Sequence, residues 1–151
     1  MKSSILTTAI LFACAAGSAM ADCTTSALVA DVPTLLNNTL VCGRPGANYP
    51  TTPGFSATDR WQEEHISSGE LWDYKLGTGP SVDPRKQVGR WSARGNQVQY
   101  NYFGGGTFTW EVRQISGSTY SFCLGSAEHA RASVTPVASF PSAGCGGTFP
   151  P

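Results

Sequence analysis

The chain has 151 residues, and its 10 lysines and arginines balance its 10 aspartates and glutamates, so the formal net charge is zero. Charged residues make up 13% of the chain, about half of the roughly 25% that is usual in soluble domains. The absence of a positive excess argues against a nucleic-acid partner. The 40% of hydrophobic residues excludes a highly charged disordered chain, and the length is that of one domain.

Residues 1–21 are predicted to form a signal peptide. A positive start is followed by an uncharged run of apolar and small residues, and Ala19-Met20-Ala21 matches the pattern that precedes signal-peptidase cleavage. The mature chain would be a single exported β-domain over residues 22–151, either secreted or periplasmic. No segment approaches the ~20 apolar residues of a transmembrane helix. An alternative is a lipoprotein anchored through a lipid on Cys14.

Cleavage at this site would leave four cysteines, and an even number in an exported domain predicts two disulfide bonds. A metal site is poorly supported, because the chain has no C-x-x-C pair. Cys42 and Cys123 lie in strand-like runs while the other two lie in the tails, which favours Cys42–Cys123 with Cys23–Cys145. Local pairing, Cys23–Cys42 with Cys123–Cys145, closes shorter loops and is almost as well supported.

The first elements of the mature chain are predicted to be short. Residues 26–30 could begin a helix that Pro33 limits, with one further turn at Leu35-Leu36. A strand is predicted over Thr39–Cys42. A long loop rich in proline and glycine follows over residues 43–58, and loops of that length are uncommon in compact domains unless they carry function or are disordered.

The next two strands are predicted at Arg60–Ile66 and Glu70–Leu76, joined by a turn. The clearest pattern lies at 87–124, where apolar and polar residues alternate between short glycine turns, which predicts an antiparallel β-meander. With a further strand at Arg131–Val134 the total approaches eight. The sequence therefore predicts an all-β fold, a small antiparallel barrel or sandwich stapled by two disulfides, and a Pro/Gly-rich tail over 136–151.

Within this meander, Gly89-Arg90-Trp91 begins a predicted strand. The tripeptide resembles the G-x-W motif of lipocalin-like barrels, where it lies on the first barrel strand, whereas here two or three strands precede it. The resemblance covers three residues and assigns no family. It implies an architectural analogy, a barrel that holds a ligand, and the alternative is a glycine and a tryptophan that simply begin a strand packed on the core.

Aromatic side chains give the first group of candidate functional residues. Tyrosine and tryptophan need a partner for their O–H or N–H when they are buried, so a barrel rich in them could line a ligand cavity or stack on sugar rings. The alternative is that a small domain fills its limited core with large rings. The candidate ligand-binding residues are Trp72, Tyr74, Trp91, Tyr100, Tyr102 and Trp110.

Glu63 and His65 form the second candidate group. They lie two residues apart in a predicted strand, so their side chains share a face with Trp61. A carboxylate beside an imidazole could bind a metal or perform acid/base chemistry, and His129 would strengthen the site if the fold brought it close. The sequence favours a simpler interpretation, a surface ion pair on a solvated face.

Three functions follow from these features. The leading hypothesis is a non-catalytic binding module for a small molecule, a glycan or a protein. The second is an envelope or secreted inhibitor or interaction protein that acts through the 43–58 loop. The third is a small acid/base or metal-assisted enzyme using Glu63 and His65. Nucleophilic catalysis lacks support, since the chain has no G-x-S-x-G motif, and no cofactor is predicted.

Overall fold

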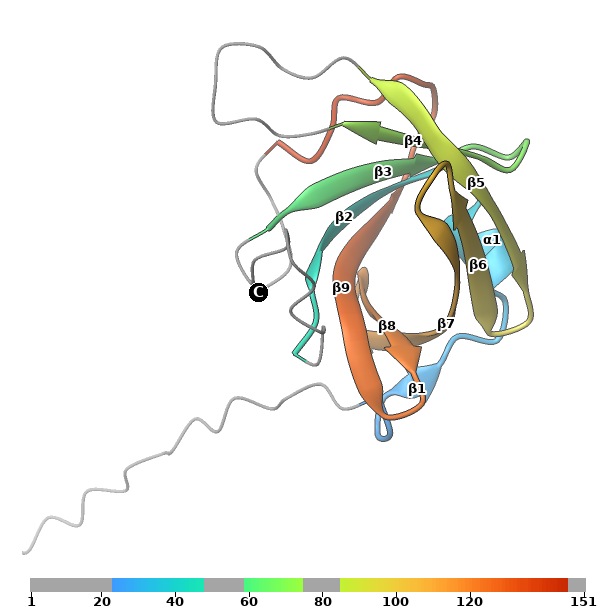
Figure 1. The fold of residues 1–151 in the computed structure, drawn as a ribbon. Coiled ribbons are helices and arrows are strands. Elements are labelled where there is room, and N and C mark those ends of the chain that lie inside the picture. The colour runs from blue at the N-terminus through green and yellow to red at the C-terminus, as the bar shows by residue number, and fades with distance from the viewer. Residues whose placement is uncertain (1–22, 48–58, 75–84, 147–151) are drawn as a thin grey trace, which may run out of the picture.

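The computed structural model describes residues 23–47, 59–74 and 85–146, and these residues form a closed antiparallel β-barrel. Each barrel strand pairs with the next along the chain, and the last pairs with the first, which closes the barrel (Figure 1). The eight barrel strands are β2 (Thr39–Pro45), β3 (Trp61–His65), β4 (Glu70–Tyr74), β5 (Lys86–Arg94), β6 (Gln97–Tyr102), β7 (Gly106–Ser116), β8 (Thr119–Leu124) and β9 (Ala127–Pro136). The all-β prediction is confirmed, and of its two architectures the barrel is the one present.

The predicted strands are all found, with some ends moved. β2 continues to Pro45, so the first residues of the predicted 43–58 loop belong to a strand, and residues 48–58 lie outside the described residues. The glycines of the predicted turns allow backbone conformations that other residues rarely adopt. Gly95, between β5 and β6, has φ 57°, and Gly117, between β7 and β8, has φ 49°.

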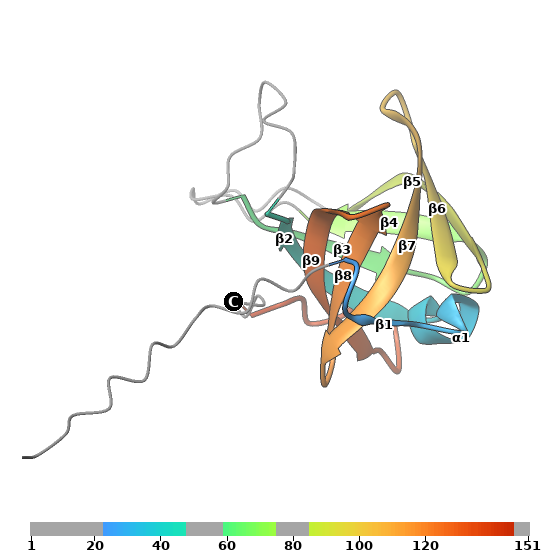
Figure 2. The ribbon, with the colours of Figure 1, turned by 90° about the horizontal axis from the view of Figure 1, so that it is seen from below.

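The predicted helix near residues 26–30 was wrong, because Ala27–Leu28 forms a short strand, β1, that pairs with β7. The helix α1 (Val32–Leu36) begins later, and Pro33 lies in its first turn, where its missing N–H is not needed. Asp31 caps the helix by accepting a hydrogen bond from the Thr34 backbone N–H at 3.1 Å. Figure 2 shows α1 at one end of the barrel and β1 beside β7.

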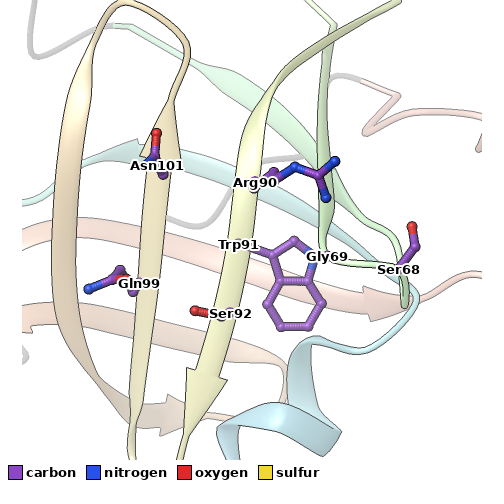
Figure 3. A pocket seen from close by; sticks show the side chains of 7 residues that line it. All are labelled: Ser68, Gly69, Arg90, Trp91, Ser92, Gln99 and Asn101. Carbon is purple, nitrogen blue, oxygen red and sulfur yellow. The ribbon is translucent and has the colours of Figure 1, made fainter.

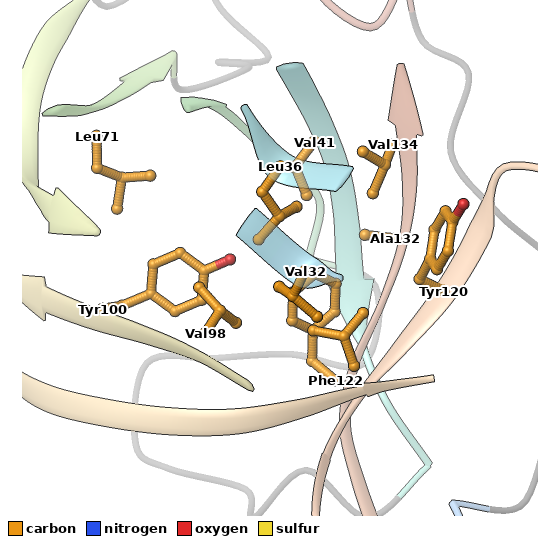
Figure 4. Close-up of a cluster of buried hydrophobic side chains, with 11 residues drawn as sticks. Val32, Leu36, Val41, Leu71, Val98, Tyr100, Tyr120, Phe122, Ala132 and Val134 are labelled. Carbon is orange, nitrogen blue, oxygen red and sulfur yellow. The ribbon is translucent and has the colours of Figure 1, made fainter. Parts of the chain in front are cut away.

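The helix closes this end of the barrel, which we call the α1 end. Val32 and Leu36 are fully buried, and the Val32 N–H donates to the Gly95 carbonyl in the β5–β6 turn at 2.9 Å. They belong to the main hydrophobic core (Figure 4). The other members of this core are Val41, Leu71, Val98, Tyr100, Val112, Tyr120, Phe122, Ala132 and Val134. The opposite end, where the β6–β7 and β8–β9 turns lie, is called the loop end below.

The C-terminal segment, residues 137–146, covers the outer face of β2 and β3. Cys145 is bonded to Cys42, and its N–H donates to the Gln62 side chain on β3 at 2.8 Å. Leu40, Cys42 and Cys145 form a second small apolar cluster on this outer face, with Val137 packed against it. The predicted C-terminal tail is therefore fixed to the barrel wall through Cys145.

The disulfides join Cys23 to Cys123 and Cys42 to Cys145, so both predicted pairings were wrong. Cys42 on β2 and Cys123 on β8 point outward, and β9 lies between their strands. At ~4.8 Å per strand, they are too far apart for a bond that needs Cα atoms within roughly 7 Å. Cys123 is instead bonded to Cys23 in the N-terminal segment, and Cys42 to Cys145 in the C-terminal segment.

The two disulfides are typical of proteins from oxidising extracellular or periplasmic compartments. No helix among the described residues is long and apolar enough to span a membrane. Residues 1–22 lie outside the described part of the chain, so the signal peptide and the lipoprotein alternative at Cys14 stay predictions.

Candidate functional site

Glu63 and His65 point into the barrel, so the interpretation of this pair as a solvated surface pair was wrong. His65 is fully buried and Glu63 is 8% exposed. Their neighbours on β3, Gln62 and Glu64, point outward and contact the C-terminal segment. The sequence predicted correctly that Glu63 and His65 share a face, but it favoured the wrong side of the barrel wall.

The interior carboxyl and imidazole are each hydrogen bonded to a tyrosine of β6. The Tyr102 hydroxyl donates to Glu63 Oε1 at 2.8 Å, and the Tyr100 hydroxyl shares a hydrogen bond with His65 Nε2 at 2.9 Å. The two tyrosine rings stack, with centroids 5.9 Å apart. Trp91 lies edge-on to the His65 ring at 5.2 Å. The structure thus brings Glu63 and His65 together with three of the aromatic candidates, Trp91, Tyr100 and Tyr102.

Glu63 has a second carboxyl beside it, Asp73, and sequence reasoning did not pair these two residues. Asp73 on β4 lies directly opposite Glu63 in the β3–β4 register, and opposite residues of an antiparallel pair share a face of the sheet. The pKa of Glu63 is raised to about 7, mainly by burial; the hydrogen bond from Tyr102 opposes the rise and the same-sign charge of Asp73 adds to it. The signal that could have found Asp73 is its alternation with Leu71, which is fully buried.

His65 is neutral at neutral pH. Burial lowers its pKa to about 3, and a hydrogen bond with the Glu63 backbone opposes only part of this effect. Burial also raises the pKa values of Tyr100 and Tyr102 well above their ordinary value, and the Glu63 charge adds to the rise. Both hydroxyls therefore remain protonated hydrogen-bond donors at neutral pH.

A run of rings continues from Tyr102 along the loop end of the barrel. Phe108 lies 6.1 Å from Tyr102 and stacks on Trp110 with centroids 6.0 Å apart. Trp110 in turn lies 4.5 Å from the His129 ring. We call Tyr100, Tyr102, Phe108 and Trp110 the aromatic run. Phe108 is 42% exposed, so part of the run is accessible to solvent.

His129 therefore packs against Trp110. The hypothesis that His129 completes a metal site with Glu63 and His65 is not supported. Within the described residues, no group of three or more histidine, cysteine, aspartate or glutamate side chains could hold a metal ion.

Of the remaining aromatic candidates, Trp72 lies outside the barrel, so its assignment to the inward face was wrong. Trp72 pairs with outward-facing Glu64 across β3–β4. Its indole N–H donates to Glu70 at 3.1 Å, and the Arg85 guanidinium stacks 4.1 Å above its ring. The reason is the alternation of β4, in which Leu71 and Asp73 take the inward positions. The Tyr74 side chain lies outside the described part.

The outer wall carries a shallow polar hollow of about 300 Å³ that sequence reasoning did not single out. It lies on β5 and β6 beside the turn before β4, and Arg90 extends toward that turn (Figure 3). Most of its lining side chains are on the outer face, and Trp91 is the residue it shares with the interior group, since the Trp91 ring contacts His65. Its lining residues are Ser68, Gly69, Arg90, Trp91, Ser92, Gln99 and Asn101.

In comparisons with family models, with curated proteins and with solved structures, no match to this chain is found.

Proposed function

We propose that this protein is a non-catalytic binding module that holds a small molecule inside its barrel, between Glu63 and the aromatic run. An eight-stranded barrel is just wide enough to be filled by its own side chains or to hold one small ligand. At the α1 end the interior is filled by the apolar core around Val32 and Leu36. Toward the loop end, carboxyl, hydroxyl and ring groups replace aliphatic side chains.

The observation that carries this proposal is the hydrogen bonding of Glu63. A carboxylate can accept about four hydrogen bonds, and this one, 8% exposed, accepts a bond from Tyr102 on one oxygen. No other described residue donates to it. Burying a carboxyl with so few donors is costly, and an apolar side chain of similar size would serve a solid core better. A ligand that donates to Glu63 accounts for its presence.

Tryptophan fluorescence tests the proposal, because Trp91 and Trp110 both pack against the interior core. A panel of fatty acids, sugars and small aromatic molecules is titrated into the oxidised protein, and at least one should give a saturable change in emission. Tyr102→Phe should weaken that binding, because it removes the hydroxyl that holds the Glu63 carboxyl in place within the aromatic run. Gln99→Ala, on the outer face, is the matched control. If no member of the panel changes the emission, the proposal is overturned.

One observation favours a second candidate, acid/base catalysis by Glu63. A general acid or base works best when its pKa lies near the operating pH, and the pKa of Glu63 is about 7. The probe 5-nitrobenzisoxazole reports such a base, because removal of its C3 proton breaks the N–O bond and releases a coloured phenolate. Turnover that Glu63→Gln abolishes and Glu111→Gln retains would support this candidate. Turnover equal in all three proteins would reject it.

The interaction-protein alternative depends on the 43–58 loop. Within the described residues, Gly46 and Ala47 at its start are held by β9: the Gly46 N–H donates to the His129 carbonyl at 2.9 Å and the Ala47 N–H to the Glu128 carboxylate at 3.3 Å. Protection of this loop from proteolysis by a candidate partner remains the test of that prediction.

A further inference from the structure

We propose that the ligand of the barrel is a primary organic amine, bound as its ammonium ion by the carboxylates of Glu63 and Asp73 with its apolar part on the aromatic run. This inference rests on the function proposed above and specifies its ligand. Four features of the barrel support it: the arrangement of the two carboxyls, the hydrogen bonding of Glu63, the placement of the described cations and the surrounding rings.

The two carboxyls lie on the same inner face of the sheet. Glu63 and Asp73 are direct partners across β3 and β4, which places their Cβ atoms ~4.5–5.5 Å apart. Two like charges opposite each other destabilise a strand pair. An ammonium ion between them converts this repulsion into two attractions, so the pair is better suited to a cation than to a neutral or anionic group.

The hydrogen-bonding capacity of Glu63 matches an ammonium donor. Its Oε1 accepts from Tyr102, and among the described residues no donor reaches Oε2. The side chain is more than nine-tenths buried, and its direction into the barrel is fixed by the contact with Tyr102 from β6. A primary ammonium carries three N–H donors and no acceptor. It can therefore donate to Glu63 Oε2 and to Asp73 at once.

Three of the arginines described are engaged in ion pairs on the outer wall of the barrel. Arg85 binds Glu64 at 2.6 Å, Arg113 lies 3.6 Å from Glu111, and Arg131 binds Glu128 at 2.8 Å. Lys86 lies closest in register to the two carboxyls, since it pairs with Asp73 across β4 and β5, and it is exposed at the loop end. Its ammonium would compete with a ligand for Asp73, which makes Lys86→Ala a useful second variant.

The rings around this pair favour an amine with an apolar body. Tyr102 links Glu63 to the aromatic run, and Phe108 and Trp110 continue it as nearly parallel rings, 3° apart. Cations are attracted to the faces of such rings, and an apolar group packs against them. An inorganic cation would be bound by the carboxylates alone, whereas an alkyl or aryl amine is bound by the carboxylates and also packs against the rings.

Protonation of Glu63 gives the binding a characteristic pH dependence. Because burial holds its pKa at about 7, an ammonium that binds below this pH must displace the proton. Affinity should rise about tenfold per pH unit up to ~7 and level off above it, since an alkylammonium stays charged to about pH 10. Among the described residues, the titratable or charged groups near Glu63 and Asp73 are His65 on the same strand as Glu63, Tyr100 and Tyr102 on β6 and Lys86 on β5.

Calorimetric titration of the oxidised protein with matched probes tests the inference. The probes are phenethylamine, 2-phenylethanol and 3-phenylpropanoate, with butylamine and butan-1-ol as smaller analogues. Phenethylamine should bind at least ~10-fold more tightly than 2-phenylethanol at pH 8, and butylamine more weakly than phenethylamine. Glu63→Gln and Asp73→Asn should each weaken amine binding at least ~10-fold. Glu111→Gln, the same change on the outer face, should leave it within twofold.

Lys86→Ala should tighten amine binding, because it removes an ammonium group that competes for Asp73. A gain in affinity cannot result from damage to the fold, so this variant complements the two carboxyl variants. Alcohol or carboxylate binding equal to or tighter than amine binding, with dependence on Tyr102, would overturn the amine inference and leave the binding module standing. An amine affinity unchanged by Glu63→Gln would also overturn it. If none of these probes binds and the wider panel is silent too, the binding module falls as well.

Discussion

Glu63 and Glu64 are neighbours on one strand and are both buried, yet they lie in opposite environments. Glu64, on the outer face, is fully buried and bound by Arg85 at 2.6 Å and by the Ser142 backbone N–H at 2.6 Å. These partners outweigh burial, so the pKa of Glu64 is lowered. Glu63, on the inner face, has one tyrosine donor and a same-sign neighbour, and its pKa is raised to about 7.

The opposite pKa shifts of Glu63 and Glu64 show that the two faces of the barrel wall treat a buried carboxylate differently. On the outside, the fold supplies a buried carboxylate with a cation and a backbone donor, and the result is a link between β3 and the C-terminal segment. On the inside, the fold buries a carboxylate without such compensation. Structural ion pairs explain the first arrangement, whereas the second costs stability and is the one that points to a ligand.

Loss of either disulfide is expected to cause the largest loss of stability. Comparing the two losses distinguishes a general effect on stability from an effect on the environment of Glu64. The bonds close segments of similar length, with separations of 100 and 103 residues, so each should contribute about 4–5 kcal/mol in the chain-entropy model. Removing Cys42–Cys145 should also release Ser142 from Glu64 and raise the Glu64 pKa. Removing Cys23–Cys123 should not.

Urea denaturation measures the stability of the two double Cys→Ala variants, and carboxyl-carbon NMR follows Glu64. Equal stability losses with a change in the Glu64 titration in the Cys42–Cys145 variant alone are expected. A Glu64 titration that shifts equally in both variants would contradict the role assigned to the C-terminal segment.

The same substitution at the two neighbouring glutamates should have opposite effects. Glu64→Gln should destabilise the protein by about 2–3 kcal/mol, because it removes a charge that is bound by Arg85 and a backbone N–H. Glu63→Gln should stabilise it at pH 8 by roughly 3 kcal/mol, because the charged form of Glu63 is then the disfavoured one. At pH 4 the Glu63 variant should differ little from the wild type. Destabilisation by Glu63→Gln at pH 8 would contradict the raised pKa.

The contributions of Glu63 and His65 to the pH dependence of the free energy of unfolding should cancel each other. The folded pKa of Glu63 is raised to about 7, so its stabilising effect is complete below the ordinary pKa of ~4.3 and is lost as the pH rises to ~7. The folded pKa of His65 is lowered to about 3, so its effect is complete above ~6.5 and is lost as the pH falls. Each gives a slope of about 1.4 kcal/mol per pH unit, with opposite sign.

The free energy of unfolding of the wild type should therefore be nearly flat between about pH 4.5 and 6.5. Glu63→Gln should expose the His65 slope, so that stability rises with pH, and His65→Asn should expose the falling slope of Glu63. His129, whose pKa burial also lowers, adds a contribution of the same sign as His65, so the wild-type curve should rise slightly just below pH ~6.5. Urea titrations at half-unit pH intervals measure these slopes, and equal slopes in wild type and Glu63→Gln would contradict the cancellation.

The strands were predictable because alternation of apolar and polar residues is local, as in Val98, Tyr100 and Tyr102. Barrel closure was not predictable from the same pattern, because it depends on pairing between β2 and β9 at opposite ends of the chain. The cysteine pairing failed for a related reason. Both strand cysteines face outward, and only the path of the tails decides which partner reaches them.

The candidate site was predictable in part. The spacing of Glu63 and His65 placed them on one face, but polar residues usually face solvent, so the favoured interpretation put that face outside. The tyrosine hydroxyls that accompany them inward come from β6, more than thirty positions along the chain. Trp72 shows the converse error, since an aromatic ring was assigned inward although Arg85 and Glu70 hold it outside.

The smallest expected effect is a shift in the pKa of Glu63 when Tyr102, but not Tyr100, loses its hydroxyl. The hydrogen bond from Tyr102 lowers the pKa of Glu63 against the effect of burial, so Tyr102→Phe should raise that pKa further. Loss of a bond worth about 1.5 kcal/mol corresponds to roughly one pH unit. Tyr100→Phe, which removes the partner of His65, is the matched control and should leave the Glu63 titration in place. Carboxyl-carbon NMR of Glu63 distinguishes them, and equal titration midpoints in both variants would show that Tyr102 does not hold the charged form.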